Sequence, residues 1–156
     1  MKTKDMNTLL EFPVPTTAVA PAQGETNPPH RILVVDDDCG VRRLVADVLI
    51  CSGYHVDTVE DGASGWRALN ASRYDVLITD NTMPGVTGLE LIKKLRSEDM
   101  NLSVILASGT VPTEELCQYP WLQLDAMLPK PYGVAELLGT VKKVLRAADS
   151  AREPIR

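Results

Sequence analysis

The sequence predicts an α/β fold with a doubly wound, five-stranded parallel sheet and five helices. Short apolar runs alternate along the chain with segments of helical periodicity, which is the pattern of βαβ units. Several of these runs are apolar throughout, as expected for strands that helices cover on both faces. Charged or hydroxyl side chains follow four of the runs, at the strand ends where sites form in such sheets.

The first strand is expected at 31–35, where the run RILVV ends at a cluster of aspartates. Apolar residues then recur at helical spacing and predict a helix between Asp38 and Gly53. They are Val41, Leu44, Val45, Val48 and Leu49. Asp38 is interpreted as the N-cap of this helix rather than as a ligand, because aspartate is a preferred cap and a glycine often follows the C-terminus. A second strand is expected at 54–60.

A weaker helix over 61–72 has Asp61 as its candidate cap, and an apolar third strand follows at 75–80. The next helix is expected to begin after Thr87. Thr87 and Glu90 have the spacing of a capping box, in which each side chain accepts from the backbone near the other. The residues expected on its buried face are Leu91, Ile92 and Leu95.

The remaining elements are a fourth strand at 103–108, a short helix at 112–119, a fifth strand at 124–128 and a final helix at 133–148. Prolines bound the short helix, so it is expected to be poorly formed. The apolar face of the final helix is formed by Val134, Leu137, Leu138, Val141 and Leu145.

The composition is that of an acidic globular protein. A net charge of −5 over 156 residues argues against nucleic-acid binding, which normally requires a basic surface. No apolar stretch approaches the roughly 18 residues needed to cross a bilayer, and no signal peptide is present, so we expect a cytoplasmic protein without membrane insertion. The three cysteines, Cys39, Cys51 and Cys117, suit neither a zinc site nor a disulfide framework. They are predicted to be buried or half-buried thiols in a reducing cytosol.

The chain divides into three parts by composition. Residues 1–29 hold five of the eleven prolines without helical or strand periodicity, and are expected to be a disordered extension. Residues 30–148 carry all the predicted elements and form one domain. Residues 149–156 are expected to be a short C-terminal tail, with no output domain.

Residues that carry chemistry follow the strands at one edge of the predicted sheet. Asp36 and Asp37 follow the first strand, Asp80 the third, Ser108 the fourth and Lys130 the fifth. Carboxylates that converge repel one another unless a cation lies among them, and oxygen ligands suit Mg²⁺. A carboxylate beside such a metal can attack phosphorus, while the metal and a lysine neutralise the phosphoryl charge. Charge alone leaves open which aspartates point inward, because alternate residues of an extended segment face opposite ways.

With these motifs in order, the sequence resembles the receiver domains of two-component response regulators. The matching segments are LVVDDD, DVLITDNTMPGVTGLE, VILASG and LPKP. The D-x-x-M-P-x-x-x-G run from Asp80 to Gly88 is a specific part of the match. The resemblance implies a flavodoxin-like fold with strand order 2-1-3-4-5 and a receiver domain over 30–148.

The resemblance also implies roles for the site residues. Asp80 matches the phosphoacceptor, and Asp36 and Asp37 match the acidic pair, with Asp37 a direct metal ligand. Asp36, Asp80 and the backbone carbonyl of Thr82 complete the implied metal site. The implied cofactor is Mg²⁺.

Ser108 matches the switch hydroxyl, and Lys130 matches the lysine that contacts the phosphoryl group. Family members usually have a cis peptide at the position of Lys130–Pro131. The sequence departs from the family at Met127, where an aromatic residue is usual. The aromatic residues considered as substitutes are Tyr119, Trp121 and Tyr132.

The function that follows is a phosphoacceptor response regulator. Asp80 would accept a phosphoryl group from a sensor histidine kinase or a histidine phosphotransfer protein, and the domain would switch a surface that binds a downstream protein. Such a switch catalyses only its own phosphorylation and dephosphorylation, so it is not an enzyme in the usual sense. One alternative is a degenerate receiver that binds partners without phosphorylation. A phosphatase resembling the haloacid dehalogenase family fits less well, because its D-x-D motif is absent where Asn81 and Thr82 follow Asp80.

Overall fold

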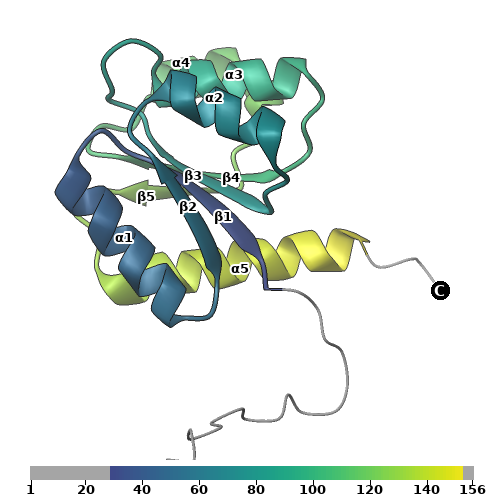
Figure 1. Cartoon of the computed structure of the whole chain (residues 1–156). Coiled ribbons are helices and arrows are strands. Elements are labelled where there is room, and N and C mark those ends of the chain that lie inside the picture. The colour runs from purple at the N-terminus through teal and green to yellow at the C-terminus, as the bar shows by residue number, and fades with distance from the viewer. Residues whose placement is uncertain (1–28, 153–156) are drawn as a thin grey trace, which may run out of the picture.

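A five-stranded parallel sheet forms the centre of the computed structural model, which describes residues 29–152 (Figure 1). The strand order is β2-β1-β3-β4-β5, and all four pairings are parallel. The strands are β1 (Arg31–Val35), β2 (His55–Val59), β3 (Val76–Asp80), β4 (Ser103–Ser108) and β5 (Ala126–Pro129). The structure therefore confirms the predicted fold class and strand order.

Five α-helices cover the two faces of the sheet. They are α1 (Cys39–Cys51), α2 (Gly62–Ala71), α3 (Gly88–Ser97), α4 (Thr113–Gln118) and α5 (Val134–Arg152), with a 3₁₀ turn, η2 (Pro120–Leu122), between α4 and β5. Helices α1 and α5 lie on one face, and α2, α3 and α4 lie on the other (Figure 1). The central strands β1, β3 and β4 are buried on both faces, as their continuous apolar runs predicted, whereas the edge strand β2 is largely exposed.

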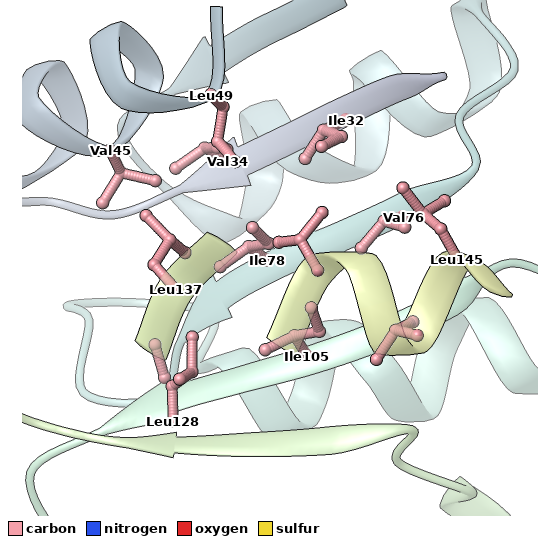
Figure 2. Packing of buried hydrophobic residues seen from close by; sticks show 13 residues of the cluster. Ile32, Val34, Val45, Leu49, Val76, Ile78, Ile105, Leu128, Leu137 and Leu145 are labelled. Carbon is pink, nitrogen blue, oxygen red and sulfur yellow. The ribbon is translucent and has the colours of Figure 1, made fainter. Parts of the chain in front are cut away.

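The pleat of each strand divides its side chains between two apolar clusters. Ile32 and Val34 of β1 face α1 and α5 and belong to a cluster that includes Leu49 of α1 and Leu137 and Leu145 of α5 (Figure 2). Leu33 and Val35 of the same strand face the other cluster, under α2 and α3. Each fully buried aliphatic side chain contributes roughly 1.5–3 kcal/mol, so the two clusters hold the strand ends at fixed positions.

The predicted helix caps are confirmed. The side chain of Asp38 accepts hydrogen bonds from the amides at the start of α1. Asp61 accepts from the amide of Ser64 at 2.7 Å and caps α2. Thr87 and Glu90 form the reciprocal bonds of a capping box at α3. These caps define where each helix begins after the preceding loop.

The prediction that the cysteines are buried or half-buried is wrong. Cys39, Cys51 and Cys117 are all exposed. Cys39 and Cys51 are the first and last residues of α1. Cys117 lies in α4, none of whose residues is buried.

Two apolar positions assigned to core-facing helix surfaces are also exposed. Leu44 is 60% exposed, because it lies about a quarter turn round α1 from the buried Val45. Val134 is 51% exposed at the first position of α5. The other predicted apolar positions of these helices belong to the cluster beneath α1 and α5 or pack against it.

Helix α5 continues to Arg152, beyond the predicted end at 148. Two side-chain contacts accompany the additional turn: Arg152 forms an ion pair with Asp75 at 3.6 Å, and Nε2 of His30 lies 3.4 Å from the carboxylate of Asp149. These contacts join the end of α5 to the amino ends of β1 and β3. Within residues 29–152, no helix is long and apolar enough to span a bilayer. The predicted extension at 1–29 lies outside the described residues except for Pro29.

A half-buried arginine of α3 binds the two loops that lead into β4 and β5. Arg96 donates to the carbonyl oxygens of Leu122 and Gln123, both at 3.0 Å, and to those of Met100 at 3.1 Å and Leu102 at 3.0 Å. These contacts hold the segment that enters β5, and with it the strand that leads to Lys130.

Candidate functional site

The carboxyl ends of β1 and β3 bring three carboxylates together. Oxygen atoms of Asp36, Asp37 and Asp80 all lie within 4.8 Å of one another. Asp36 and Asp80 are only 4% and 7% exposed, whereas Asp37 is exposed. The structure thus resolves which aspartates point inward, and it leaves Asp38 outside the cluster as a helix cap.

Lys130 supplies the positive charge of this cluster. Its ammonium lies 3.0 Å from Asp36 Oδ2 and 3.5 Å from Asp80 Oδ2. Burial alone would lower the pKa of Lys130, but the hydrogen bond to Asp36 and the charges of Asp36 and Asp80 together raise it above its usual value. The lysine is therefore charged at neutral pH. The Lys130–Pro131 peptide is cis, as the resemblance implied.

Burial raises the pKa of Asp80 above its usual value. The Lys130 ammonium opposes this effect, and the charge of Asp36 adds to it. The ionised form of Asp80 is accordingly less stable in the folded protein than in the unfolded chain.

We expect Asp80→Asn to stabilise the metal-free protein at pH 7, because the neutral amide avoids the cost of burying a carboxylate. A carboxyl with a raised folded pKa contributes stability that is fully present below its unfolded pKa, about 3.9, and is lost as pH rises through the folded value. Asparagine stays neutral at every pH. The extra free energy of unfolding of Asp80→Asn over wild type should therefore shrink as pH falls toward about 4. Urea unfolding with a chelator at both pH values measures this difference.

Asp47→Asn provides the control for that measurement, because Asp47 is exposed on α1. Its free energy of unfolding should stay close to wild type at both pH values. A loss of stability in Asp80→Asn at pH 7 would contradict the prediction, and would mean that the ion pair with Lys130 outweighs the burial of the carboxylate.

The loop after β3 is folded back around Asn81. The carbonyl of Asn81 accepts from the amides of Met83 at 3.1 Å and Gly88 at 3.2 Å. Its side-chain oxygen accepts from the amide of Leu89 at 3.1 Å. The loop thereby joins the end of β3 to the start of α3. This role of Asn81 was not predicted from the sequence, although asparagine directly after a strand is typical of such turns.

Thr82 lies beside Asp80 in this loop. Its amide donates to Asp80 Oδ1 at 3.3 Å, which orients the carboxylate. The assignment of its backbone carbonyl as a metal ligand stays a prediction.

Ser108 ends β4 and is buried. Its hydroxyl donates to the carbonyl of Thr110 at 2.8 Å and accepts from the amide of Thr110 at 3.3 Å. The hydroxyl is therefore engaged within its own loop rather than with the carboxylates. Contact with a group on Asp80 would require it to release Thr110.

Met127 packs into the cluster under α2 and α3, opposite Leu106 of β4. Of the aromatic residues considered as substitutes for a switch aromatic, Tyr119 packs against the same cluster, while Tyr132 packs against the one on the other face of the sheet. Trp121 is 46% exposed and forms an edge-on contact with Tyr119, with ring centroids 6.1 Å apart. Tyr119 is thus the aromatic residue that shares the surroundings of Met127.

Arg42 is a residue at the site that the sequence analysis did not identify. It lies in the first turns of α1 and donates to the backbone carbonyl of Asp36 at 2.7 Å. Its place one turn into the helix that follows an acidic loop could have indicated a contact with that loop. Only the folded structure shows that it contacts the carbonyl of Asp36.

The donor set fits a hard divalent cation. Three carboxylates offer oxygen atoms only, and the exposed Asp37 leaves the cluster open to solvent. Mg²⁺ prefers oxygen ligands and keeps several waters, so few protein ligands suffice. The fold and the cluster together define a class: doubly wound domains with an acidic cation site and a lysine at the carboxyl edge of a 2-1-3-4-5 sheet.

Comparison with known proteins agrees with this class. Residues 32–142 match the family model described as the response regulator receiver domain. The response regulator MprA of Mycobacterium sp. (strain KMS) is 32% identical over 126 residues, which are 81% of this chain and 55% of that protein. This chain thus spans about half the length of the curated relatives it matches.

Two solved structures give the same result. The receiver domain of Francisella response regulator 1452 has a TM-score of 0.70 and 28% identity, covering 76% of this chain and 98% of that one. Response regulator TrrA of Thermotoga maritima, solved in complex with Mg(2+)-BeF, has a TM-score of 0.67 and 32% identity, covering 74% and 99%. The chain belongs to the response regulator receiver domain family, which consists of signalling switches of two-component systems rather than enzymes.

Proposed function

We propose that this protein is a phosphorylation switch in which Asp80 accepts a phosphoryl group with Mg²⁺ as the cofactor. The observation that carries the proposal is the Lys130 ammonium between Asp36 and Asp80, with Asp37 at the same opening. The cluster combines a buried carboxylate, a fixed cation and oxygen atoms for a metal. A degenerate interaction module has no need of this arrangement.

The transfer itself is a substitution at phosphorus. An Asp80 carboxylate oxygen forms a P–O bond while the P–N bond of a donor phosphohistidine breaks, and the leaving imidazole keeps the electron pair. Lys130 stays charged and offsets the negative charge of the phosphoryl oxygens. Asp36, Asp37, Asp80 and the Thr82 carbonyl would hold Mg²⁺, which when bound offsets the remaining charge.

Ser108 supplies a route from phosphorylation to a change in shape. A phosphoryl oxygen on Asp80 would compete with the carbonyl of Thr110 for the Ser108 hydroxyl. Release of Thr110 would alter the loop between β4 and α4. Phosphorylation shifts the population only if the new contacts favour the altered loop. This protein would act in the cytoplasm, and its expected partners are a sensor histidine kinase or histidine phosphotransfer protein and a downstream protein.

The test is the intact mass of the full chain after incubation with acetyl phosphate. We expect a phosphoryl-sized increase that requires Mg²⁺ and is absent in Asp80→Asn. Asp47→Asn is the matched control, since it removes an exposed carboxylate from α1 and should be phosphorylated normally. Wild type without an increase, and without binding of the fluoride mimic BeF₃⁻, would favour the degenerate module instead.

A further inference from the structure

Four polar atoms of Asp36 have partners in the structure. The amide donates to the carbonyl of Val59 at 3.3 Å. Oδ1 accepts from the amide of Asp38 at 2.9 Å, and Oδ2 accepts from Lys130 at 3.0 Å. The backbone carbonyl accepts from the guanidinium of Arg42 at 2.7 Å. The first three contacts come from the sheet, the capping turn and the site lysine, whereas the fourth comes from a residue with no assigned role.

The contact with Arg42 fixes a peptide plane. Because a peptide unit is planar, holding the carbonyl oxygen of Asp36 also holds the following amide and the Cα of Asp37. The plane fixes the position of the Asp37 Cα and the direction of its N–Cα bond, so only rotation about that bond and within the side chain is left to direct the carboxylate. Asp36 is buried and has other partners, but Asp37 is exposed, so packing does not hold it in place.

We propose that Arg42 is a positioning residue that holds Asp37 toward the cation site, an inference that rests on the function proposed above. Arg42 is half-buried, and its hydrogen bond to Asp36 is among the shortest at the site. It acts through the backbone and not through contact with the metal. Groups that orient metal ligands in this way commonly change metal affinity by about 10–100-fold.

The charge of Arg42 and its hydrogen bond affect cation binding in opposite directions. A guanidinium beside the cluster repels a divalent cation, so loss of the charge alone would tighten Mg²⁺ binding. Loss of the hydrogen bond frees the peptide between Asp36 and Asp37 and weakens binding. Arg43 is the matched control, because it is the next residue along α1, is exposed and carries the same charge.

The experiment is calorimetric titration of the full chain with Mg²⁺. Arg42→Met should weaken binding by about tenfold or more relative to Arg43→Met, which should bind as wild type or more tightly. Arg42→Lys retains a donor and the charge, and should restore most of the affinity. Urea unfolding with a chelator should show Arg42→Met folded under the titration conditions.

Each outcome bears on one proposal. If wild type binds Mg²⁺ and Arg42→Met binds no more weakly than Arg43→Met, the positioning role is wrong and the phosphoacceptor function is unaffected. If Arg42→Met loses affinity only because it has unfolded, the positioning role is wrong as well. If wild type does not bind Mg²⁺, the proposed function fails, and the role of Arg42 fails with it.

Discussion

Gly88→Ala is expected to destabilise the protein by about 3 kcal/mol, the upper end of the range for an overpacked site. Gly88 is the first residue of α3, and a methyl group there would overlap the backbone carbonyl oxygen of Asp80 and lie 3.0 Å from Cα of Asn81. Both neighbours are backbone atoms, so no side-chain rotation relieves the overlap. The end of β3 or the start of α3 must move, in a core that is close-packed on that side.

Gly139→Ala is the matched control for this change. Gly139 lies within α5, and a methyl group there meets no atom within 4 Å. Alanine is the better helix former by up to about 1 kcal/mol, so this variant should be as stable as wild type or more stable. Urea unfolding of the two variants measures the difference, and a Gly88→Ala protein as stable as Gly139→Ala would show that the loop after β3 adapts freely.

The same contact makes Gly88 relevant to the site. The carbonyl that the methyl group would displace belongs to Asp80 itself, and the adjoining loop is held by the carbonyl of Asn81. Gly88→Ala molecules that remain folded should therefore be phosphorylated by acetyl phosphate more slowly than wild type. The glycine of the D-x-x-M-P-x-x-x-G motif is therefore required in this chain because any larger side chain would overlap the backbone at the end of β3.

The strands and the helix starts could be predicted from the sequence because their causes are local. Continuous apolar runs such as 76–78 indicate a strand covered on both faces, and that strand is buried throughout. Asp61 and Thr87 cap their helices through contacts within three residues. Site residues at strand ends were also predictable, since parallel strands bring their carboxyl ends to one edge.

Other features depend on contacts between distant parts of the chain. Both Asp36 and Asp37 follow β1, but Asp36 is buried because its amide still bonds to Val59 of β2 and its carboxylate pairs with Lys130, whereas Asp37 lies exposed in the turn that follows. The last turn of α5 accompanies an ion pair between Arg152 and Asp75, which lie 77 positions apart by their numbers (152 − 75). The contact between Arg42 and the Asp36 carbonyl likewise needs the loop geometry as well as the spacing.

Lys130→Met is expected to slow phosphorylation by acetyl phosphate by about 10²–10³-fold. The Lys130 ammonium is fixed between Asp36 and Asp80, at 3.0 and 3.5 Å, so it is already in place when negative charge accumulates on the phosphoryl oxygens. Methionine fills similar space without charge. The rate is measured from the time course of the intact-mass increase at saturating Mg²⁺.

Lys143→Met is the matched control, because Lys143 is exposed on α5 and the substitution is chemically the same. Its rate should equal that of wild type. Loss of a positive charge beside the cluster should leave Mg²⁺ binding by Lys130→Met unchanged or tighter. A slow phosphorylation rate with intact Mg²⁺ binding would therefore show that the lysine stabilises the charge of the phosphoryl group. A rate within tenfold of wild type would mean that the bound metal alone provides that stabilisation. Arg42→Met should show the reverse combination, with weak Mg²⁺ binding and a rate that recovers as the Mg²⁺ concentration is raised.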